Sequence, residues 1–210
     1  MHSEIAKLLE HYPDLEPCIG EVDAAFNLLK TTYRNGGKLL ICGNGGSAAD
    51  SDHIVGELMK GFELKRPIKD DLRQSLNEVN PEMGAYLADH LQGALPAISL
   101  SAHAALASAV INDTAGDMTF AQQVLGYGVK GDTLIGISTS GNAANVRYAL
   151  TVAKALGLQT IGLSGKTGGK MRGLCDVTIC VPNERTLAIQ ERHLPIYHTL
   201  CIMLEQEFFG

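Results

Sequence analysis

One short stretch constrains the fold of this chain most: residues 39–50, with the sequence LLICGNGGSAAD. Its apolar half predicts a buried strand, and its glycine-rich half is followed at once by helix-forming residues. A strand, a tight loop and a helix in this order leave backbone N–H groups free at the helix N-terminus, which favours an anion. The glycines permit positive φ, and Ser47 can cap the helix or bind a ligand oxygen. The stretch predicts a site for a phosphorylated or polyhydroxylated small molecule.

The alternation of strand and helix continues along the chain. Strands are predicted at residues 39–42, 97–100, 132–137, 159–163 and 177–181. Helices are predicted at residues 48–59, after the second strand up to 111, and at 120–126, 142–156 and 184–208. This order predicts a three-layer α/β fold, in which a doubly wound parallel sheet is covered by helices on both faces. Ligands of such sheets bind at the C-terminal ends of the strands.

Two further helical regions belong to what we expect to be a single domain, residues 1–210. Apolar residues at helical spacing, broken near Pro13 and Pro17, predict an N-terminal helical region over residues 1–35. Its apolar face exceeds what one small domain needs, which predicts a homo-oligomer. Apolar residues between 72 and 91, with Pro81 at a turn or helix start, predict a helical hairpin inserted at about 64–94.

Charge and cysteine usage exclude several classes of protein. The 17 basic and 23 acidic residues give a net charge of −6 and form no Lys/Arg block, which argues against nucleic-acid binding. No apolar run approaches the roughly 20 residues that span a bilayer, and the N-terminus lacks a signal-peptide pattern. The five cysteines form no CxxC pair and lie mostly in apolar surroundings. We therefore expect a cytoplasmic protein with reduced thiols and with neither nucleic-acid nor membrane partners.

A second polar loop, residues 138–142 (STSGN), follows the apolar run that ends at residue 137. Three consecutive hydroxyls at a helix start suit the oxygens of a phosphate, because each hydroxyl is a donor and the helix dipole favours an anion. Capping alone needs only one hydroxyl, so the pattern favours ligand binding. Neither the Walker spacing nor the G-x-G-x-x-G spacing is present, which disfavours dinucleotide binding.

Two groups of polar residues on helices are candidates for acid–base chemistry or metal binding. His53 and Glu57 are four residues apart and share one helix face, where they can hold a divalent metal or supply a base. Taken alone, such a spacing is more typical of a hydrogen-bonded surface pair than of a catalytic or metal site. On the last helix, Gln190 and His198 are about 12 Å apart along an unbroken helix. One metal binds both only if the side chains reach toward each other, or if different subunits contribute them. His193 on the same helix has an equal chance of being a structural histidine.

These residues together resemble the sugar isomerase (SIS) domain family, and within it the bacterial phosphoheptose isomerases. The matching stretches cover most of the chain beyond residue 35: CGNGGSAADSDHIVGEL at 42–58, LPAISL at 95–100, Asn112-Asp113, GDTLIGISTSGNAANV at 131–146, GLQTIGLSGKTGGK at 157–170 and IQERHLPIYHTLC at 189–201. The resemblance implies a flavodoxin-like SIS fold, a homotetramer with sites at subunit interfaces, and an aldose–ketose isomerase. The implied reaction interconverts sedoheptulose 7-phosphate and D-glycero-D-manno-heptose 7-phosphate through an enediol.

The resemblance also implies a role for each matching residue. Glu57 and His198 would transfer the protons, and a divalent metal, zinc by resemblance, would be held by His53, Glu57, Gln190 and His198. The substrate-binding residues implied are Asn44, Gly45, Gly46, Ser47, Glu57, Asn112, Asp113, Ser138, Thr139, Ser140, Asn142 and Gln190.

The chain departs from the family pattern at three places. Ala143 stands where the family often has serine, His103 stands where it has an acidic pocket residue, and the 65–94 segment is longer than usual. These departures leave open the isomerisation of another phosphosugar. A non-catalytic SIS regulator or scaffold, of the type that assembles a replication initiator, is a further alternative. The presence of His53, Glu57, Gln190 and His198 favours the enzyme.

Overall fold

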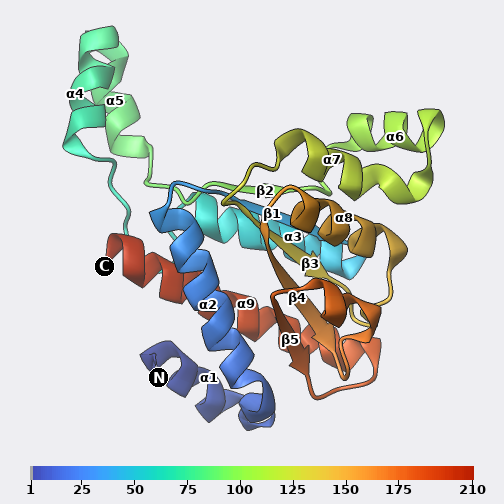
Figure 1. The fold of residues 1–210 in the computed structure, drawn as a ribbon. Coiled ribbons are helices and arrows are strands. Elements are labelled where there is room, and N and C mark those ends of the chain that lie inside the picture. Colours follow the sequence, from blue (N-terminus) through green and yellow to red (C-terminus); the bar gives the residue numbers. More distant parts are fainter. Residues whose placement is uncertain (1) are drawn as a thin grey trace.

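The computed structural model describes residues 2–210 and contains a five-stranded parallel sheet with helices on both faces (Figure 1). The strands are β1 (Leu39–Gly43), β2 (Ala97–Ser99), β3 (Thr133–Ile137), β4 (Gln159–Gly165) and β5 (Val177–Val181). They lie in the order β2-β1-β3-β4-β5, and all neighbours pair in parallel. This confirms the predicted doubly wound sheet. The strand order reverses between β1 and β3, and open α/β sheets bind ligands at such a switch point.

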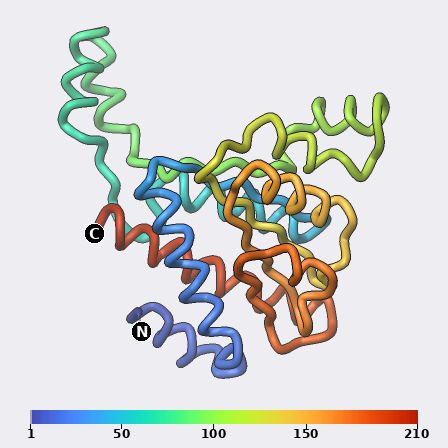
Figure 2. The backbone as a smooth tube through the Cα atoms, in the orientation of Figure 1, coloured from blue at the N-terminus to red at the C-terminus, as the bar shows by residue number. Residues whose placement is uncertain are grey.

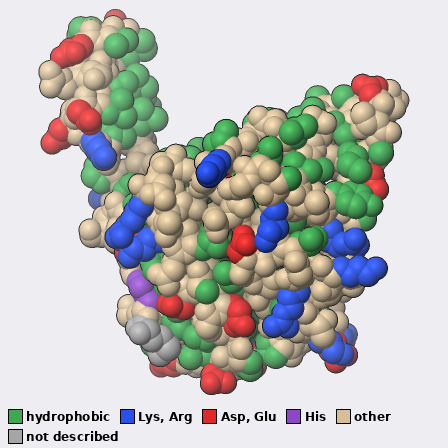
Figure 3. Space-filling model, viewed as in Figure 1, with side chains coloured by type: hydrophobic (Ala, Val, Ile, Leu, Met, Phe, Trp, Pro, Cys, Tyr) green, Lys and Arg blue, Asp and Glu red, His purple; other side chains and the backbone are tan. Residues whose placement is uncertain are grey.

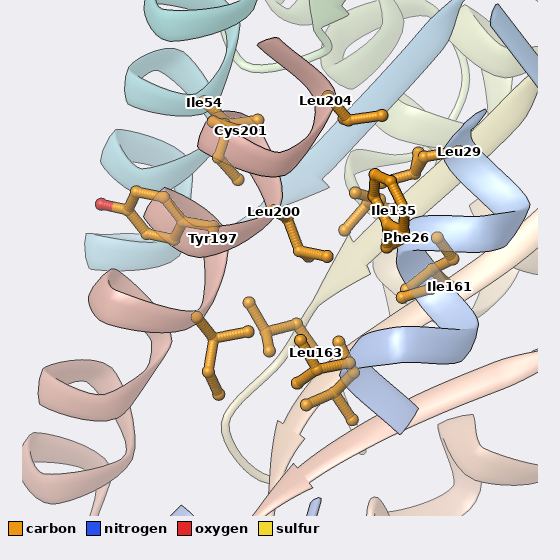
Figure 4. Close-up of a cluster of buried hydrophobic side chains, with 14 of the residues drawn as sticks. Phe26, Leu29, Ile54, Ile135, Ile161, Leu163, Tyr197, Leu200, Cys201 and Leu204 are labelled. Carbon is orange, nitrogen blue, oxygen red and sulfur yellow. The ribbon is translucent and has the colours of Figure 1, made fainter. Parts of the chain in front are cut away.

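The side chains of β1 alternate between two cores, because successive residues of a strand point to opposite faces. Leu39 and Ile41 pack into the larger core, and Leu40 and Cys42 into the smaller one. The larger core, part of which is drawn in Figure 4, lies against four helices: α1 (Ser3–His11), α2 (Ile19–Arg34), α3 (Gly46–Met59) and α9 (Thr186–Phe209). The smaller core lies against α7 (Thr119–Tyr127) and α8 (Ala144–Ala155).

Short 3-10 segments complete the layers at Pro13–Cys18, Gly116–Met118 and Gly169–Leu174. The first of these separates α1 from α2, as the two prolines predicted. The five cysteines are all free, and burial raises the pKa of the Cys18 and Cys201 thiols to about 12. Among residues 2–210, no helix combines the length and the apolar character needed to cross a bilayer.

Two helical elements project from the body of the molecule (Figures 1 and 2). One is α6 (Ala104–Asp113), and the other is a hairpin of α4 (Asp70–Val79) and α5 (Pro81–His90), as the sequence predicted. Asn80 caps α5 by accepting hydrogen bonds from two backbone N–H groups, and Pro81 occupies the first turn. The hairpin exposes Val79 (86%) and Tyr86 (65%), and hydrophobic side chains gather along it in Figure 3. Helix α4 buries no residue at all.

Several predicted boundaries were wrong by about two residues. Helix α3 begins at Gly46, and its N-cap is Gly45 with a φ of 56°. Of the two roles that the sequence left open for Ser47, helix capping is wrong, since Ser47 lies inside the first turn with its side chain buried, and ligand binding stays a prediction. Strand β4 continues past Leu163 to Gly165, and α8 begins only at Ala144.

Candidate functional site

The two glycine-containing loops meet at the switch point of the sheet. β1 and β3 pair as far as Gly43 and Ile137, so the loops that follow them leave the sheet side by side. The side-chain amides of Asn44 and Asn145 then join the loops through two reciprocal hydrogen bonds, 2.9 and 2.8 Å long. The predicted phosphate and sugar loops thus form one continuous edge.

The first loop is tightly packed at its base and exposed at its tip. A Cβ on Gly43 would lie 2.6 Å from the Ser47 carbonyl oxygen, so this position requires glycine. Gln190 of α9 reaches the loop, since a Cβ on Gly46 would lie 2.5 Å from its Nε2. Asn44, Gly45 and Gly46 are exposed, as contact with a ligand requires.

The second loop presents hydroxyls that its helix does not use as caps. The N-cap of α8 is Ala143, which makes no side-chain capping bond. Within the loop, the Asn142 N–H donates to Ser140 Oγ over 3.2 Å, and Gly141 turns the chain with a φ of 65°. Ser138 is buried, Thr139 is half-buried and Ser140 is exposed. The hydroxyls therefore line the loop from its base to its surface.

A buried chain of hydrogen bonds supports this second loop from below. Ser164 Oγ, at the end of β4, donates to the Ser138 carbonyl oxygen over 2.7 Å. The Ser164 carbonyl in turn accepts from His193 Nε2 over 3.3 Å. His193 is fully buried, and desolvation lowers its pKa to about 4. It is thus a neutral structural histidine at neutral pH.

The lowered pKa of His193 predicts a pH dependence of stability. In the unfolded chain this imidazole takes up a proton near pH 6.5, whereas the folded chain resists protonation down to about pH 4. The free energy of unfolding is therefore unaffected by this histidine above pH 6.5. It decreases by about 3 kcal/mol as the pH falls from 6.5 toward 4. Urea unfolding should show this loss in the wild type, and His193→Gln should lack most of it. His11→Gln, which replaces an exposed imidazole, is the control, and equal pH slopes in all three proteins would contradict the assignment.

A second cluster of polar side chains lies between α3 and α9. His53 Nε2 is 3.2 Å from Glu57 Oε1 and 3.4 Å from His198 Nε2. The Tyr197 hydroxyl donates to Asp50 over 3.3 Å and lies 3.1 Å from His53 Nδ1. It therefore accepts the His53 Nδ1 proton, which leaves the Nε2 lone pair facing Glu57 and His198. Such an arrangement needs a proton or a cation between these atoms.

The environment of this cluster favours a neutral His198. Partial burial lowers the pKa of His198, and His53 lowers it further, while Glu57 opposes the shift. A neutral imidazole both accepts and donates a proton, as a proton-transfer residue must. Burial likewise raises the pKa of Asp50, although the Tyr197 hydroxyl opposes this.

The chain does not bring all of the predicted site residues together. Gln190 stands beside Gly46, and Gly46 and Glu57 are about 16 Å apart along the axis of α3. Asn112 and Asp113 lie exposed at the end of the projecting α6, hydrogen-bonded to each other. Among residues 2–210, no three His, Cys, Asp or Glu side chains form a group that could hold a metal ion.

Sequence reasoning missed four residues that shape the site: Asp50, Asn145, Ser164 and Tyr197. Asn145 and Tyr197 contact partners about 100 or more positions away in the chain. Both fall inside stretches that the resemblance quoted, but their side chains carry no spacing pattern with their partners.

Comparisons with known proteins show the family to which the chain belongs. The family model of the SIS domain matches residues 4–89 and 76–165. The chain belongs to the SIS domain family. The phosphoheptose isomerase of Aliarcobacter butzleri is 39% identical over 207 residues, covering 98% of this chain and 93% of that protein. That of Trichlorobacter lovleyi is 40% identical over 179 residues, covering 85% and 78%.

Solved structures place this SIS domain among the same relatives. The phosphoheptose isomerase of Neisseria gonorrhoeae matches with a TM-score of 0.75 and 31% identity, covering 97% of this chain and 96% of that one. The enzyme of Francisella tularensis matches with a TM-score of 0.74 and 27% identity, over 97% and 95% of the two chains. The similarity therefore extends over the whole SIS domain, including its N-terminal helices.

Proposed function

We propose that this protein is an aldose–ketose isomerase that converts sedoheptulose 7-phosphate to D-glycero-D-manno-heptose 7-phosphate. The observation that carries the proposal is the hydroxyl-lined loop at the switch point, joined to the GNGGS loop by Asn44 and Asn145. Full-length similarity to phosphoheptose isomerases supports the choice of a seven-carbon substrate.

In this proposal the two loops bind the substrate away from the reacting carbons. Ser138, Thr139 and Ser140 donate to the phosphate oxygens, and hydrogen bonds to a charged acceptor are the stronger ones. The exposed tip of the first loop contacts the sugar hydroxyls. Binding energy from these groups orients the reacting end of the sugar.

Glu57 and His198 carry the proton transfers in this mechanism. The Glu57 carboxylate removes a proton from the carbon beside the carbonyl and returns it to the neighbouring carbon. His198, neutral because its pKa is lowered, transfers a proton between the two sugar oxygens. Both steps pass through an enediol, and no atom is gained or lost.

A second copy of the chain would complete the site. Glu57 lies about 16 Å along α3 from the first loop, whereas a base must be within hydrogen-bond distance of the proton it removes. We therefore propose a homotetramer in which His53, Glu57 and His198 of one copy face the loops and Gln190 of another. The apolar surface of the α4–α5 hairpin and the exposed α6 support self-association.

Light scattering should give about four times the 22.4 kDa of one chain, and a monomer at micromolar concentration would contradict the proposed tetramer.

The composite site predicts complementation between two inactive variants. Glu57→Gln lacks the base, and Ser138→Ala/Ser140→Ala lacks two phosphate donors, so each homo-oligomer should be inactive. Co-expressed subunits should regain on the order of a quarter of wild-type activity, because mixed interfaces pair an intact base with an intact loop. Variants tested alone are the controls. Absence of any recovery in verified mixed oligomers would show that each chain has its own complete site.

We also propose that a divalent cation, zinc by donor type, binds at His53, Glu57 and His198 in the assembled oligomer, because the described residues of one chain alone do not form a complete group of metal ligands. Two imidazoles and a carboxylate are donors that zinc accepts, and the Tyr197–Asp50 chain fixes the His53 tautomer that such a ligand needs. Gln190 of a second copy would be the fourth ligand. The ion would supply Lewis-acid polarisation of the sugar oxygens.

Metal analysis and zinc titration of chelator-treated protein test this proposal. The wild type and the control His103→Ala should bind zinc, and His53→Ala should not.

The direct test is a panel of five- to seven-carbon ketose phosphates, followed by NMR in deuterated water, with and without chelator. Turnover and solvent deuterium at the carbon beside the carbonyl should appear with sedoheptulose 7-phosphate. Turnover of another member alone would shift the substrate assignment, and no turnover of any member would favour a non-catalytic regulator or scaffold.

We place the reaction in the cytoplasm, which the five free cysteines favour.

A further inference from the structure

A buried ion pair joins α9 to the segment that follows α3. The Arg66 and Glu205 side chains are both fully buried, and Arg66 Nε donates to Glu205 Oε1 over 2.7 Å. The Arg66 guanidinium also lies over the Phe209 ring, 4.7 Å from its centroid. A buried ion pair brings little stability compared with an apolar pair of the same size. The pair therefore matters more for the backbone segments that it holds in place than for overall stability.

The carboxylate of Glu205 organises the segment that leaves α3. It accepts hydrogen bonds from the backbone N–H groups of Phe62, Glu63 and Leu64 at 2.8, 2.8 and 3.0 Å. Burial alone raises the pKa of Glu205, but these donors and Arg66 outweigh burial and lower the pKa. Glu205 is therefore ionised at neutral pH, and its charge is fully compensated.

The guanidinium of Arg66 holds the end of α3 itself. Its Nη2 donates to the Glu57 carbonyl oxygen over 3.0 Å, and its Nη1 donates to that of Leu58 over 2.8 Å. Helix α3 ends at Met59, so these are among the last carbonyls, which a helix leaves without internal partners. The positive charge also stands at the negative end of the helix dipole. The backbone of Glu57 is thus fixed by a side chain outside its helix.

The same pair connects Glu57 to His198. Glu205 lies seven residues after His198 on α9, which is two helical turns or about 10 Å. The connection runs from the Glu57 backbone through Arg66 and Glu205 to α9 and hence to His198. Reaction rates depend steeply on such geometry, since a displacement of about 1 Å can cost about 100-fold.

We propose that Arg66 and Glu205 are positioning residues, which fix the last turn of α3 against α9 so that the Glu57 carboxylate and the His198 imidazole keep their separation. This proposal rests on the proposed isomerase function for its kinetic consequence. The separation of the two side chains is a property of the folded chain and does not depend on any substrate.

The test is Arg66→Lys, assayed in the full-length protein. Lysine keeps the charge but lacks the planar fork that serves two carbonyls and a carboxylate at once. We expect kcat to fall by about 100-fold while KM for sedoheptulose 7-phosphate changes less than threefold. In metal-free, ¹⁵N-labelled protein at alkaline pH, the imidazole resonances of His53 and His198 should shift, because the nearby Glu57 carboxylate moves. The double variant Arg66→Met/Glu205→Met, which leaves no unpaired charge, should show the same losses if Arg66→Lys does not fold.

Asp132→Asn is the matched control. Asp132 is also a buried carboxylate that pairs with a lysine and accepts backbone N–H groups, but it precedes β3 at the opposite end of the sheet from the loops. Its replacement should lower Tm without shifting the imidazole resonances or kcat. Unchanged kcat and unchanged imidazole resonances in the Arg66 variants would overturn the positioning role. An inactive wild type with shifted resonances in Arg66→Lys would instead refute the isomerase and leave the positioning role standing.

Discussion

Replacing Glu57 by glutamine should lower kcat by about 1,000-fold or more, since a positioned general base contributes about 100- to 10,000-fold. The amide has nearly the shape of the carboxylate but cannot accept the proton beside the sugar carbonyl. The fold should persist, because the Glu57 contacts that hold α3 are made by its backbone. Steady-state kinetics and loss of deuterium incorporation from solvent would measure the effect.

Two measurements decide how this result is interpreted. The Kd for inorganic phosphate should change less than threefold in Glu57→Gln, because the proposed phosphate loop, residues 138–142, belongs to a different part of the fold. Asp52→Asn, which removes an exposed carboxylate from the same helix, should keep wild-type turnover. A Glu57→Gln enzyme within tenfold of wild-type kcat would remove Glu57 from the mechanism.

The second large effect is expected at Gly141. Its φ of 65° disfavours any side chain, and a Cβ there would lie 1.9 Å from the Gly168 carbonyl oxygen. Alanine must therefore push the 138–142 loop away from the chain at Gly168. The loss of two hydrogen bonds to a phosphate, about 1.5–3 kcal/mol each, should weaken phosphate binding on the order of 100-fold or more. Calorimetric titration with phosphate and thermal unfolding would measure the two consequences.

Gly157→Ala separates backbone strain from steric conflict. Gly157 has a φ of 78°, but the nearest atom to its Cβ would be Lys130 Cγ at 3.4 Å. Alanine there should cost only the left-handed backbone penalty, about 1–2 kcal/mol, and leave phosphate binding unchanged. If Gly141→Ala binds phosphate as tightly as Gly157→Ala does, the 138–142 loop is not the phosphate site.

The sheet and its helices could be predicted because their residues carry local patterns. Each strand is a short apolar run, and apolar residues at helical spacing on both sides of Pro81 predicted the hairpin. The errors occurred where tertiary contacts replace local signals. β4 extends to Gly165 because Ser164 and Gly165 pair with β5 although neither is apolar. Helix α8 starts late because the Asn142 side chain bonds Ser140 and Lys170 instead of a helix backbone.

The site was predictable to the extent that its residues sit in recognisable stretches. His53, Glu57 and His198 do come together, although α3 and α9 are far apart in the sequence. Their roles, like those of Asn112, Asp113 and Gln190, stay predictions. Arg66 and Glu205 could not be found from the sequence. They are ordinary charged residues 139 positions apart, and only the folded chain reveals that both are buried.

The stem of the α4–α5 hairpin has a consequence for how this chain can be altered. Pro67 pairs with Gln92, and the Gly93 N–H donates to the Arg66 carbonyl oxygen. The two ends of the hairpin segment are therefore held close together where they join the body of the molecule. Lengthening a loop whose ends are already held together costs little, about 0.6 kcal/mol for each doubling. We therefore expect that the hairpin can be replaced by a longer hairpin, a shorter turn or an inserted reporter domain while the sheet stays intact.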